Sequence, residues 1–282
     1  VSFAAAKFGR EVVFKYTKFP EGVDFSATKF NRGVDFKYTK FYSPTDFTNV
    51  TYETVDGTTL HGYLAFPDES TEETTYPAVL MIHEWWGLNA EIIELADELA
   101  SEGFVVLAPD TYRGKTAGSV PGALFLRISV DMERVMTDMD AAYAYLADLP
   151  QVNSSVGIVG FCYGGDVAFN YGLANSDLDA VINLYGSTRA DSDAFMPLVG
   201  EDAAPVLAIF GAEDGMIPVE EVEAHEAALN EAGVTNTVTI YDGVGHAFVQ
   251  PDEIGEPSAA FSAWQQIITF FNANLESAEP AS

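Results

Sequence analysis

A single cysteine stands in a stretch whose spacing suits a nucleophile. Cys162 is the only cysteine in 282 residues, and it lies in the sequence GFCYGG at 160–165, directly after an apolar run. Glycines two positions before and after a reactive residue fit the sharp strand-to-helix turn called a nucleophile elbow, here with cysteine in place of serine. The N–H groups of the following helix favour a thiolate. A buried structural cysteine, the commoner fate of this residue, would not need both glycines.

A nucleophile at such a turn needs an acid and a histidine base, in the chain order nucleophile, acid, histidine. Two histidines follow Cys162. His246 lies in a Gly-rich loop after the last expected strand, where a base belongs, whereas His225 lies in an acidic helical stretch and is expected on a solvated helix face. Asp214 follows another expected strand and is preferred as the acid. Its neighbour Glu213 is the weaker alternative, because it would point away if Asp214 points inward.

These candidates require strands and helices that bring their loops to one edge of a sheet. Beyond residue 46, continuous apolar runs that suit strands alternate with segments that suit helices. Strands are expected at 48–55, 59–66, 76–84, 104–110, 154–160, 180–186, 204–211 and 237–243, and helices at 90–104, 131–149, 164–175, 219–233 and 261–275. The alternation predicts an α/β fold with a mostly parallel sheet and helices on both faces.

The first 45 residues follow a different pattern. Phenylalanines recur at 3, 8, 14, 19, 25, 30, 36, 41 and 47, which gives an 11-residue unit such as FKYTKFPEGVD or FSATKFNRGVD. The pattern weakly resembles pentapeptide repeats of the F-x-x-x-x-F kind, whose family fold is a four-sided β-helix with the Phe inside. A small β-meander, or an appended segment unrelated to the rest of the chain, is at least as compatible, because nine units make only about two coils.

Charge is distributed unevenly along the chain. Residues 1–42 carry eight of the 13 Lys and Arg but only four of the 43 Asp and Glu, so the remaining 240 residues hold five basic against 39 acidic side chains. Such a surface repels itself in dilute buffer, and concentrated salt screens the repulsion. The composition resembles that of proteins from salt-accumulating microbes, so a halophilic protein is expected. Nucleic acid is an unsuitable partner for so acidic a body.

The composition also limits domain organisation and location. We expect a Phe-rich repeat segment at 1–45, one globular domain at 46–275 and a disordered acidic tail at 276–282. Apolar runs are far shorter than a membrane span, and no secretory leader pattern opens the sequence. The expectation is therefore a cytoplasmic protein without a membrane partner, either a monomer or a weak homo-oligomer.

Six short stretches together resemble the dienelactone hydrolase family: HEWWGLN, APDTY, the segment 131–145, GFCYGG, GAEDGMIP and GHAF. The resemblance covers about residues 46–272. It implies an α/β-hydrolase fold and a triad of Cys162, Asp214 and His246. It also implies a hydrolase for ester or lactone bonds, of the carboxymethylenebutenolidase type or a related carboxylesterase, with a small-molecule substrate and neither a metal nor an organic cofactor.

The same resemblance assigns roles to the stretch HEWWGLN. The backbone N–H groups of Trp85 and Tyr163 form the oxyanion hole, and Glu84 holds the resting thiol and helps to deprotonate it. His83 would face away from Glu84 and is interpreted as a packing residue. Trp86 is expected to line an apolar substrate site together with the two oxyanion-hole residues.

Two departures from the family bear on the substrate. Members that act on dienelactone bind its carboxylate with arginines, one of them four residues after the histidine, where this chain has Gln250. Arg127, from a neighbouring turn, is the candidate to replace the other. Without a fixed cationic fork a neutral or weakly charged ester or lactone is expected. A thioesterase or peptidase on the same scaffold stays open, as does a non-catalytic sensor or interaction protein that uses the N-terminal repeat.

Overall fold

The computed structural model describes residues 2–10, 12–19, 21, 23–30, 34–36, 39–41, 45–68, 70–71, 73–186, 188, 199, 203–277 and 279–280. By their contacts, residues 1–154 with 278–282 form one compact unit and residues 155–277 a second one. The division into segments 1–45, 46–275 and 276–282 stays a prediction about the organisation of the sequence.

The N-terminal segment winds into parallel coils. Strand β1 (Lys7–Phe8) pairs with β4 (Lys29–Phe30), β2 (Val12–Val13) with β5 (Val34–Asp35), and β3 (Lys18–Phe19) with β6 (Lys40–Phe41), each in parallel and 22 residues apart. Bridges from Ser2 to Asp24 and from Asp24 to Asp46 add the fourth side of the coil. These pairings are those of a four-sided β-helix, because a meander would pair its neighbouring strands in antiparallel.

Stacked phenylalanine rings fill the centre of the coils. Phe3, Phe25 and Phe47 stack with centroid distances of 5.1 and 5.5 Å, and Phe14 stacks on Phe36 at 5.3 Å. The threonine two residues before a phenylalanine links one coil to the next, as where the Thr28 hydroxyl donates to the Phe3 carbonyl at 2.9 Å. Aromatic stacking in register thus replaces the larger core that so short a repeat cannot build.

The rest of the first unit contains strands in the order β7 (Val50–Glu53), β8 (Thr59–Ala65), β10 (Val105–Pro109) and β9 (Thr74–Ile82). The pairs β7–β8 and β8–β10 are antiparallel and β10–β9 is parallel. Gly57, at a φ of 83°, closes the predicted hairpin between β7 and β8. Helices α1 (Ala90–Ser101) and α3 (Met132–Ala147) cover this part of the sheet.

The two helices lie on opposite faces. Tyr52 of β7 stacks on Tyr145 of α3 at 5.2 Å, whereas the Tyr63 hydroxyl donates to Asp97 of α1 at 2.8 Å. Since Tyr52 pairs with Leu60, and residues 60 and 63 of one strand point to opposite sides, α1 and α3 flank the sheet. Asn89 caps α1 as expected, because its side chain accepts from Ile92 N–H at 3.2 Å.

Helix α2 (Val120–Ser129) was not expected from the sequence, although a proline lies in its first turn. Of its residues only Ala123 is buried, and Val120, Leu124, Phe125 and Ile128 are exposed. Because these apolar side chains are not confined to a buried face, the helical period carried no clear signal.

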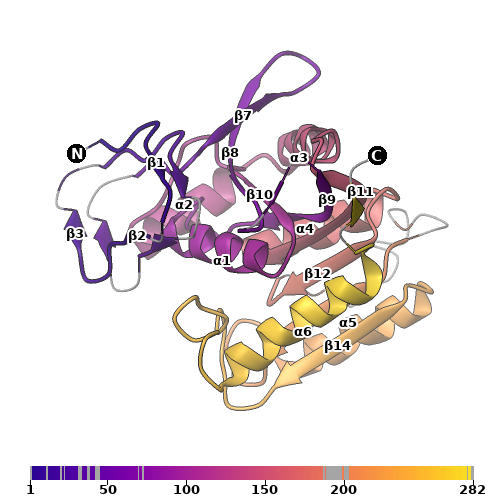
Figure 1. Cartoon of the computed structure of the whole chain (residues 1–282). Helices are drawn as coiled ribbons and strands as arrows, with labels where there is room; N and C mark the ends of the chain where they lie inside the picture. The colour runs from indigo at the N-terminus through magenta and orange to yellow at the C-terminus, as the bar shows by residue number, and fades with distance from the viewer. Residues whose placement is uncertain are drawn as a thin grey trace. The chain divides into compact units, whose positions relative to one another are not determined.

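Helix α1 lies beside the N-terminal repeat (Figure 1), and two of its carboxyl groups accept hydrogen bonds from backbone N–H groups there. Glu94 accepts from Phe36 N–H, and Asp97 accepts from Tyr63 and from the backbone of Val34. Burial raises the pKa of Glu94 to about 8 and that of Asp97 to about 7, against the smaller opposing effect of these hydrogen bonds. The contact between α1 and the repeat therefore holds acids that ionise near neutral pH.

This burial predicts a stability that falls as the pH rises. A carboxyl group with a raised pKa in the folded state stabilises the fold fully below its unfolded pKa, and that contribution is lost as the pH rises through about 7 to 8. The double variant Glu94→Gln and Asp97→Asn should flatten the decline between pH 5.5 and 8.5. At pH 8.5 it should gain about 1 to 2 kcal/mol, less than the full shifts would give because solvent screens the charge.

Urea unfolding at the two pH values in one salt measures this effect. Glu226→Gln, at an exposed site on the second unit, is the matched control and should keep the decline of the parent chain. An unchanged pH slope in the double variant would contradict the assignment.

The second unit carries a parallel sheet in the order β14 (Asn236–Tyr241), β13 (Val206–Gly211), β12 (Ala180–Leu184) and β11 (Val152–Phe161). Helix α5 (Val219–Glu231) packs on β14. Helix α4 (Tyr163–Ala174) contacts Val181 at Gly172, and Phe271 of helix α6 (Ala259–Asn274) contacts Gly157. Gly157 and Val181 belong to opposite sheet faces, since Val181 pairs with Ile158. The predicted parallel sheet with helices on both faces is thereby confirmed for this unit.

One prediction about the C-terminus is wrong. Strand β15 (Glu279–Pro280) pairs in antiparallel with Thr74–Thr75 of β9, where a disordered tail was expected. Backbone pairing at a strand end can order a segment whose composition is polar, and composition carries no sign of it.

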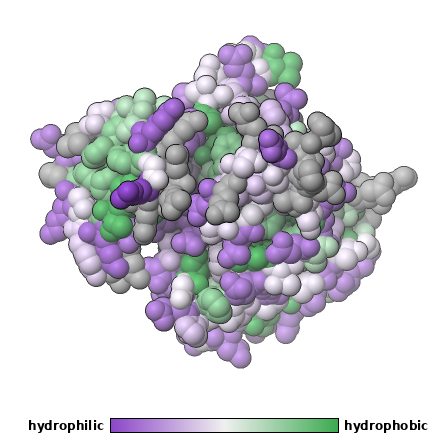
Figure 2. Space-filling model, viewed as in Figure 1, coloured by the Kyte–Doolittle hydropathy of each residue, from purple (hydrophilic) through white to green (hydrophobic). Residues whose placement is uncertain are grey.

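The hydropathy of the surface agrees with the large number of acidic residues in the sequence. Hydrophilic residues predominate on the face seen in Figure 2, and hydrophobic ones gather over the N-terminal segment. Exposed apolar side chains there include Val13. Among the residues that the structure describes, no helix has the length and apolar character to cross a bilayer.

Candidate active site

Cys162 lies at a strained turn between β11 and α4. It has φ 53° and ψ −111°, an unusual conformation for a residue with a side chain, and its own N–H donates to the Leu184 carbonyl at 3.0 Å. A Cβ at Gly160 would overlap the Gly164 carbonyl, and one at Gly165 would crowd Asn183. The glycine spacing in GFCYGG is therefore required by close backbone approach, as expected of an elbow. The sulfur-bearing residue is half-buried.

An aspartate and a histidine are paired in the same unit. His246 Nδ1 lies 2.7 Å from Asp214 Oδ2, and the Asp214 side chain is fully buried. The other carboxylate oxygen of Asp214 accepts from the N–H groups of Met216 and Ile217 at 2.8 and 3.2 Å. These bonds fix the carboxylate, which in turn orients the ring. Glu213, the weaker candidate, is exposed.

His246 directs its second nitrogen away from the aspartate. His246 Nε2 is buried, and among the described residues it has no hydrogen-bond partner. A buried ring nitrogen without a partner is costly in a structural role but suits a base that awaits a proton.

Tyr185 connects the histidine to the elbow, and sequence analysis did not single it out. Its ring lies edge-on to His246 with centroids 5.3 Å apart, and it directly follows Leu184, whose carbonyl accepts from the Cys162 N–H. Tyr185 also has a positive φ of 38°. Its place just beyond the end of a parallel strand was the available signal, because ligand sites of α/β sheets gather at these ends.

The three loops that follow β11, β13 and β14 end at the same edge of the parallel sheet. Glu213 N–H donates to the Val244 carbonyl at 2.9 Å, and a Cβ at Gly211 would collide with the carbonyls of Val244 and Gly245. The loops that carry Asp214 and His246 are thus packed together backbone to backbone, so the hydrogen bond between these side chains is held by the fold and not by side chains alone.

Glu84 and the two tryptophans belong to the first unit. Glu84 lies two residues after the end of β9 and is buried. Burial, with a smaller effect of Glu91, raises the pKa of its carboxyl group to about 7. Trp85 and Trp86 are half-buried, with ring centroids 5.3 Å apart at an angle of 66°. A carboxylic acid with a pKa near 7 can both release and take up a proton at neutral pH.

The neighbouring histidine has the packing role that the sequence suggested. His83 is fully buried, with Nδ1 at 2.6 Å from the Glu84 carbonyl and Nε2 at 2.8 Å from the Thr111 hydroxyl. His225 contradicts its prediction: it is fully buried and lies edge-on to Phe169 at 5.0 Å. The acidic sequence around it suggested a solvated face, but α5 turns its few apolar positions and this ring toward α4.

The two candidate substrate-binding residues, Gln250 and Arg127, belong to different units. Gln250 follows the His246 loop in the second unit, and its side-chain amide donates to the Ala247 carbonyl at 2.9 Å. Arg127 lies in the last turn of α2 in the first unit. Among the described residues no cluster of three or more His, Cys, Asp or Glu side chains is arranged to hold a metal ion.

Comparison with known proteins identifies the family to which the chain belongs. The model of the dienelactone hydrolase family matches residues 60–275. The chain belongs to the dienelactone hydrolase family. As a member it is a hydrolase that acts on ester or lactone bonds.

Relatives and solved structures agree with the match. A protein from Synechocystis named "Putative carboxymethylenebutenolidase" is 30% identical to this chain, over 76% of this chain and 92% of the relative. A protein of the same name from Yersinia pestis is 28% identical, over 79% of this chain and 87% of the relative. The crystal structure of a "Putative Dienelactone Hydrolase" from Klebsiella pneumoniae has a TM-score of 0.68 at 25% identity, covering 79% of this chain and 98% of that one. The predicted α/β-hydrolase-like fold is confirmed.

Proposed function

We propose that this family member hydrolyses neutral or weakly charged carboxylic esters and lactones through a cysteine nucleophile. The observation that carries the proposal is the contact at 2.7 Å between His246 and the buried carboxylate of Asp214, in the same unit as a cysteine at a strained elbow. A nucleophile, a base and a group that orients the base are the parts that covalent acyl transfer requires.

The proposed reaction has two halves. His246 takes the thiol proton, and the Cys162 thiolate forms a C–S bond to the carbonyl carbon. The resulting oxyanion collapses, the C–O bond to the leaving group breaks, and the imidazolium gives its proton to the departing alkoxide. His246 then takes a proton from water, whose oxygen attacks the thioester carbonyl. The second oxyanion collapses, the C–S bond breaks to release the carboxylic acid, and the imidazolium returns its proton to the Cys162 thiolate. Asp214 keeps the Nδ1 proton in place and stabilises the imidazolium.

Further roles rest on the family resemblance. Tyr163 begins α4, and its N–H is proposed as an oxyanion donor, with Trp85 N–H as the second; one such donor is typically worth about 3 kcal/mol of transition-state stabilisation. Glu84 is proposed to help deprotonate the thiol, which its pKa of about 7 supports. Trp86, Gln250 and Arg127 are proposed substrate contacts. A cytoplasmic location stays a prediction.

A panel of substrates tests the proposed specificity. Because the chain carries a net charge of −30, an anionic substrate should be repelled in dilute buffer. Neutral p-nitrophenyl esters and simple lactones should have kcat/KM at least about tenfold above matched carboxylated analogues, and concentrated salt should narrow the gap. Thioesters and peptides belong in the panel. A preference for the carboxylated compounds, or for peptides, would refute the proposed substrate class.

Salt should also support folding and activity. Charges of like sign on the body are screened over about 10 Å at 0.1 M salt but over about 3 Å at 1 M. The thermal midpoint and kcat/KM for a neutral ester should therefore rise between 0.05 and 2 M KCl. A flat or falling profile in both measurements would contradict a halophilic protein.

A further inference from the structure

A pocket in the first unit lies between the end of the N-terminal repeat, strand β8 and the loop 110–116. It has a volume of about 420 Å³ and is lined by residues 45–48 after the coils, by 59–61 of β8, by Leu88 and by side chains of the loop 110–116. We call it the repeat pocket. Its size lies at the lower end of the range of about 300 to 1,000 Å³ typical of small-molecule sites, so a molecule of the size of a monosaccharide fits in it.

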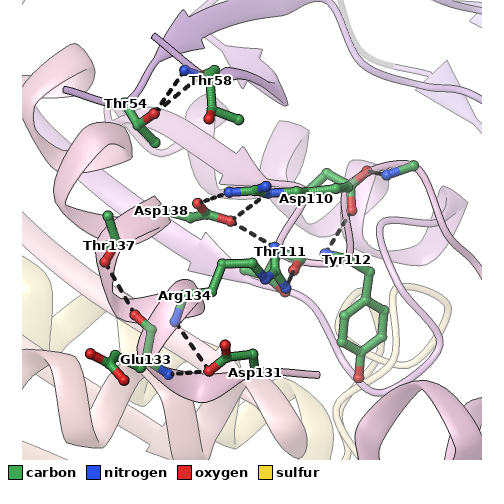
Figure 3. Close-up of polar contacts among 12 residues, drawn as sticks. Thr54, Thr58, Asp110, Thr111, Tyr112, Asp131, Glu133, Arg134, Thr137 and Asp138 are labelled. Carbon is green, nitrogen blue, oxygen red and sulfur yellow. Dashed lines mark hydrogen bonds and ion pairs between the residues drawn. The ribbon is translucent and has the colours of Figure 1, made fainter. Parts of the chain in front are cut away.

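Hydrogen bonds within the protein hold the walls of the repeat pocket in place. Asp110 accepts from the N–H groups of Tyr112 at 3.1 Å and of Gly114, which closes the loop on itself (Figure 3). Arg113 forms two bonds to Asp138, at 3.0 and 2.6 Å. On the opposite wall one oxygen of Asp46 accepts from the N–H and the hydroxyl of Thr48. A pocket whose walls are already ordered loses little free energy through the ordering of side chains and loops when it binds a ligand.

Polar groups face this space from several walls. Among the described residues, the hydroxyls of Thr59 and Thr116 and the ring of His61 have no hydrogen-bond partner, and neither does the second oxygen of Asp46. Phe47, Leu60 and Leu88 supply an apolar surface between them. The pocket thus offers hydrogen-bond donors and acceptors around an apolar patch.

The charge of the lining excludes one class of ligand. Asp46 and Asp110 bring two carboxylates, while the single guanidinium, of Arg113, is already paired with Asp138. An anion would find no unpaired cation there. An ammonium ion would satisfy the carboxylates but not the threonine donors. A hydroxyl group both donates and accepts, and the C–H face of a polyol packs on apolar side chains.

We propose that the repeat pocket binds a neutral polyhydroxyl compound of the size of a monosaccharide or sugar alcohol. The N-terminal repeat is then a ligand-binding wall and not a passive appendage. The pocket also adjoins the loop of the two tryptophans: Leu88 lines it, and Ala117 N–H, at the end of the pocket loop, donates to the Trp86 carbonyl at 2.9 Å. Occupation of the pocket should therefore alter indole emission.

Binding is tested on the full chain by titration calorimetry and saturation-transfer NMR, with sorbitol and glucose as probes. Choline and citrate, at matched ionic strength, represent the cationic and anionic classes. We expect saturable binding of a neutral probe with a change in tryptophan fluorescence. Thr116→Val and Asp46→Asn should each weaken it by about fivefold or more, the effect of losing one hydrogen bond. Thr237→Val, at an exposed threonine of β14, is the control and should leave the dissociation constant unchanged.

Absence of saturable binding by both neutral probes would overturn the proposal, as would a preference for choline or citrate, or binding that the pocket variants leave unaltered. No hydrolysis is measured, and the Cys162→Ala variant should bind the probes as the parent chain does. Failure of this inference is therefore distinguishable from failure of the proposed catalytic function.

Discussion

Cys162→Ala should lower kcat for p-nitrophenyl acetate by about 10⁴-fold or more, because the substitution removes the sulfur that is proposed to form the acyl intermediate. The substitution removes one sulfur atom at a half-buried position, so the fold should persist. Circular dichroism and the thermal midpoint check that the variant is folded before its rate is interpreted.

The wild-type chain provides an independent measurement of the same claim. Because Cys162 is the only cysteine, iodoacetamide can label one thiol, and the site of modification is unambiguous. Loss of activity should follow the incorporation of one label with the same rate constant. Full activity in the folded alanine variant, or in the labelled protein, would remove Cys162 from the mechanism and leave the interaction-module alternative in place.

Asp214→Asn should lower kcat by roughly 10²- to 10⁴-fold with a much smaller change in KM. The amide keeps the shape of the side chain and can still accept from Met216 and Ile217. It can no longer carry the negative charge that stabilises the imidazolium of His246, and an amide N–H facing Nδ1 favours the wrong tautomer.

The adjacent residue supplies a matched control. Glu213 is exposed, so Glu213→Gln should keep nearly the parent rate. Comparison of kcat and KM for the two variants at one pH and one salt concentration decides between the two acids that the sequence left as candidates. The reverse result, a large loss at Glu213 and none at Asp214, would show that the hydrogen bond between Asp214 and His246 is structural.

Much of the fold followed from local pattern. The buried strands, the capped helix α1 and the elbow were all predicted, because apolar period, capping residues and glycine spacing act over a few neighbouring residues. Helix α2 and the pairing of β15 were missed because the pattern of neighbouring residues does not reveal either of them. The first exposes apolar side chains, and the second depends on a strand 200 residues earlier in the chain.

The sequence by itself determined which groups follow the ends of three strands of the sheet: Cys162 between its glycines, Asp214 and His246, in the order that an elbow nucleophile requires. It also determined the 11-residue period of the repeat. Tertiary structure alone decided that the repeat coils in parallel, that His225 is buried, that Glu84, Glu94 and Asp97 have raised pKa values, and that a pocket opens beside the repeat. The physical reason is that backbone geometry is set by near neighbours, whereas burial, charge environment and cavities are set by segments that meet only when the chain folds.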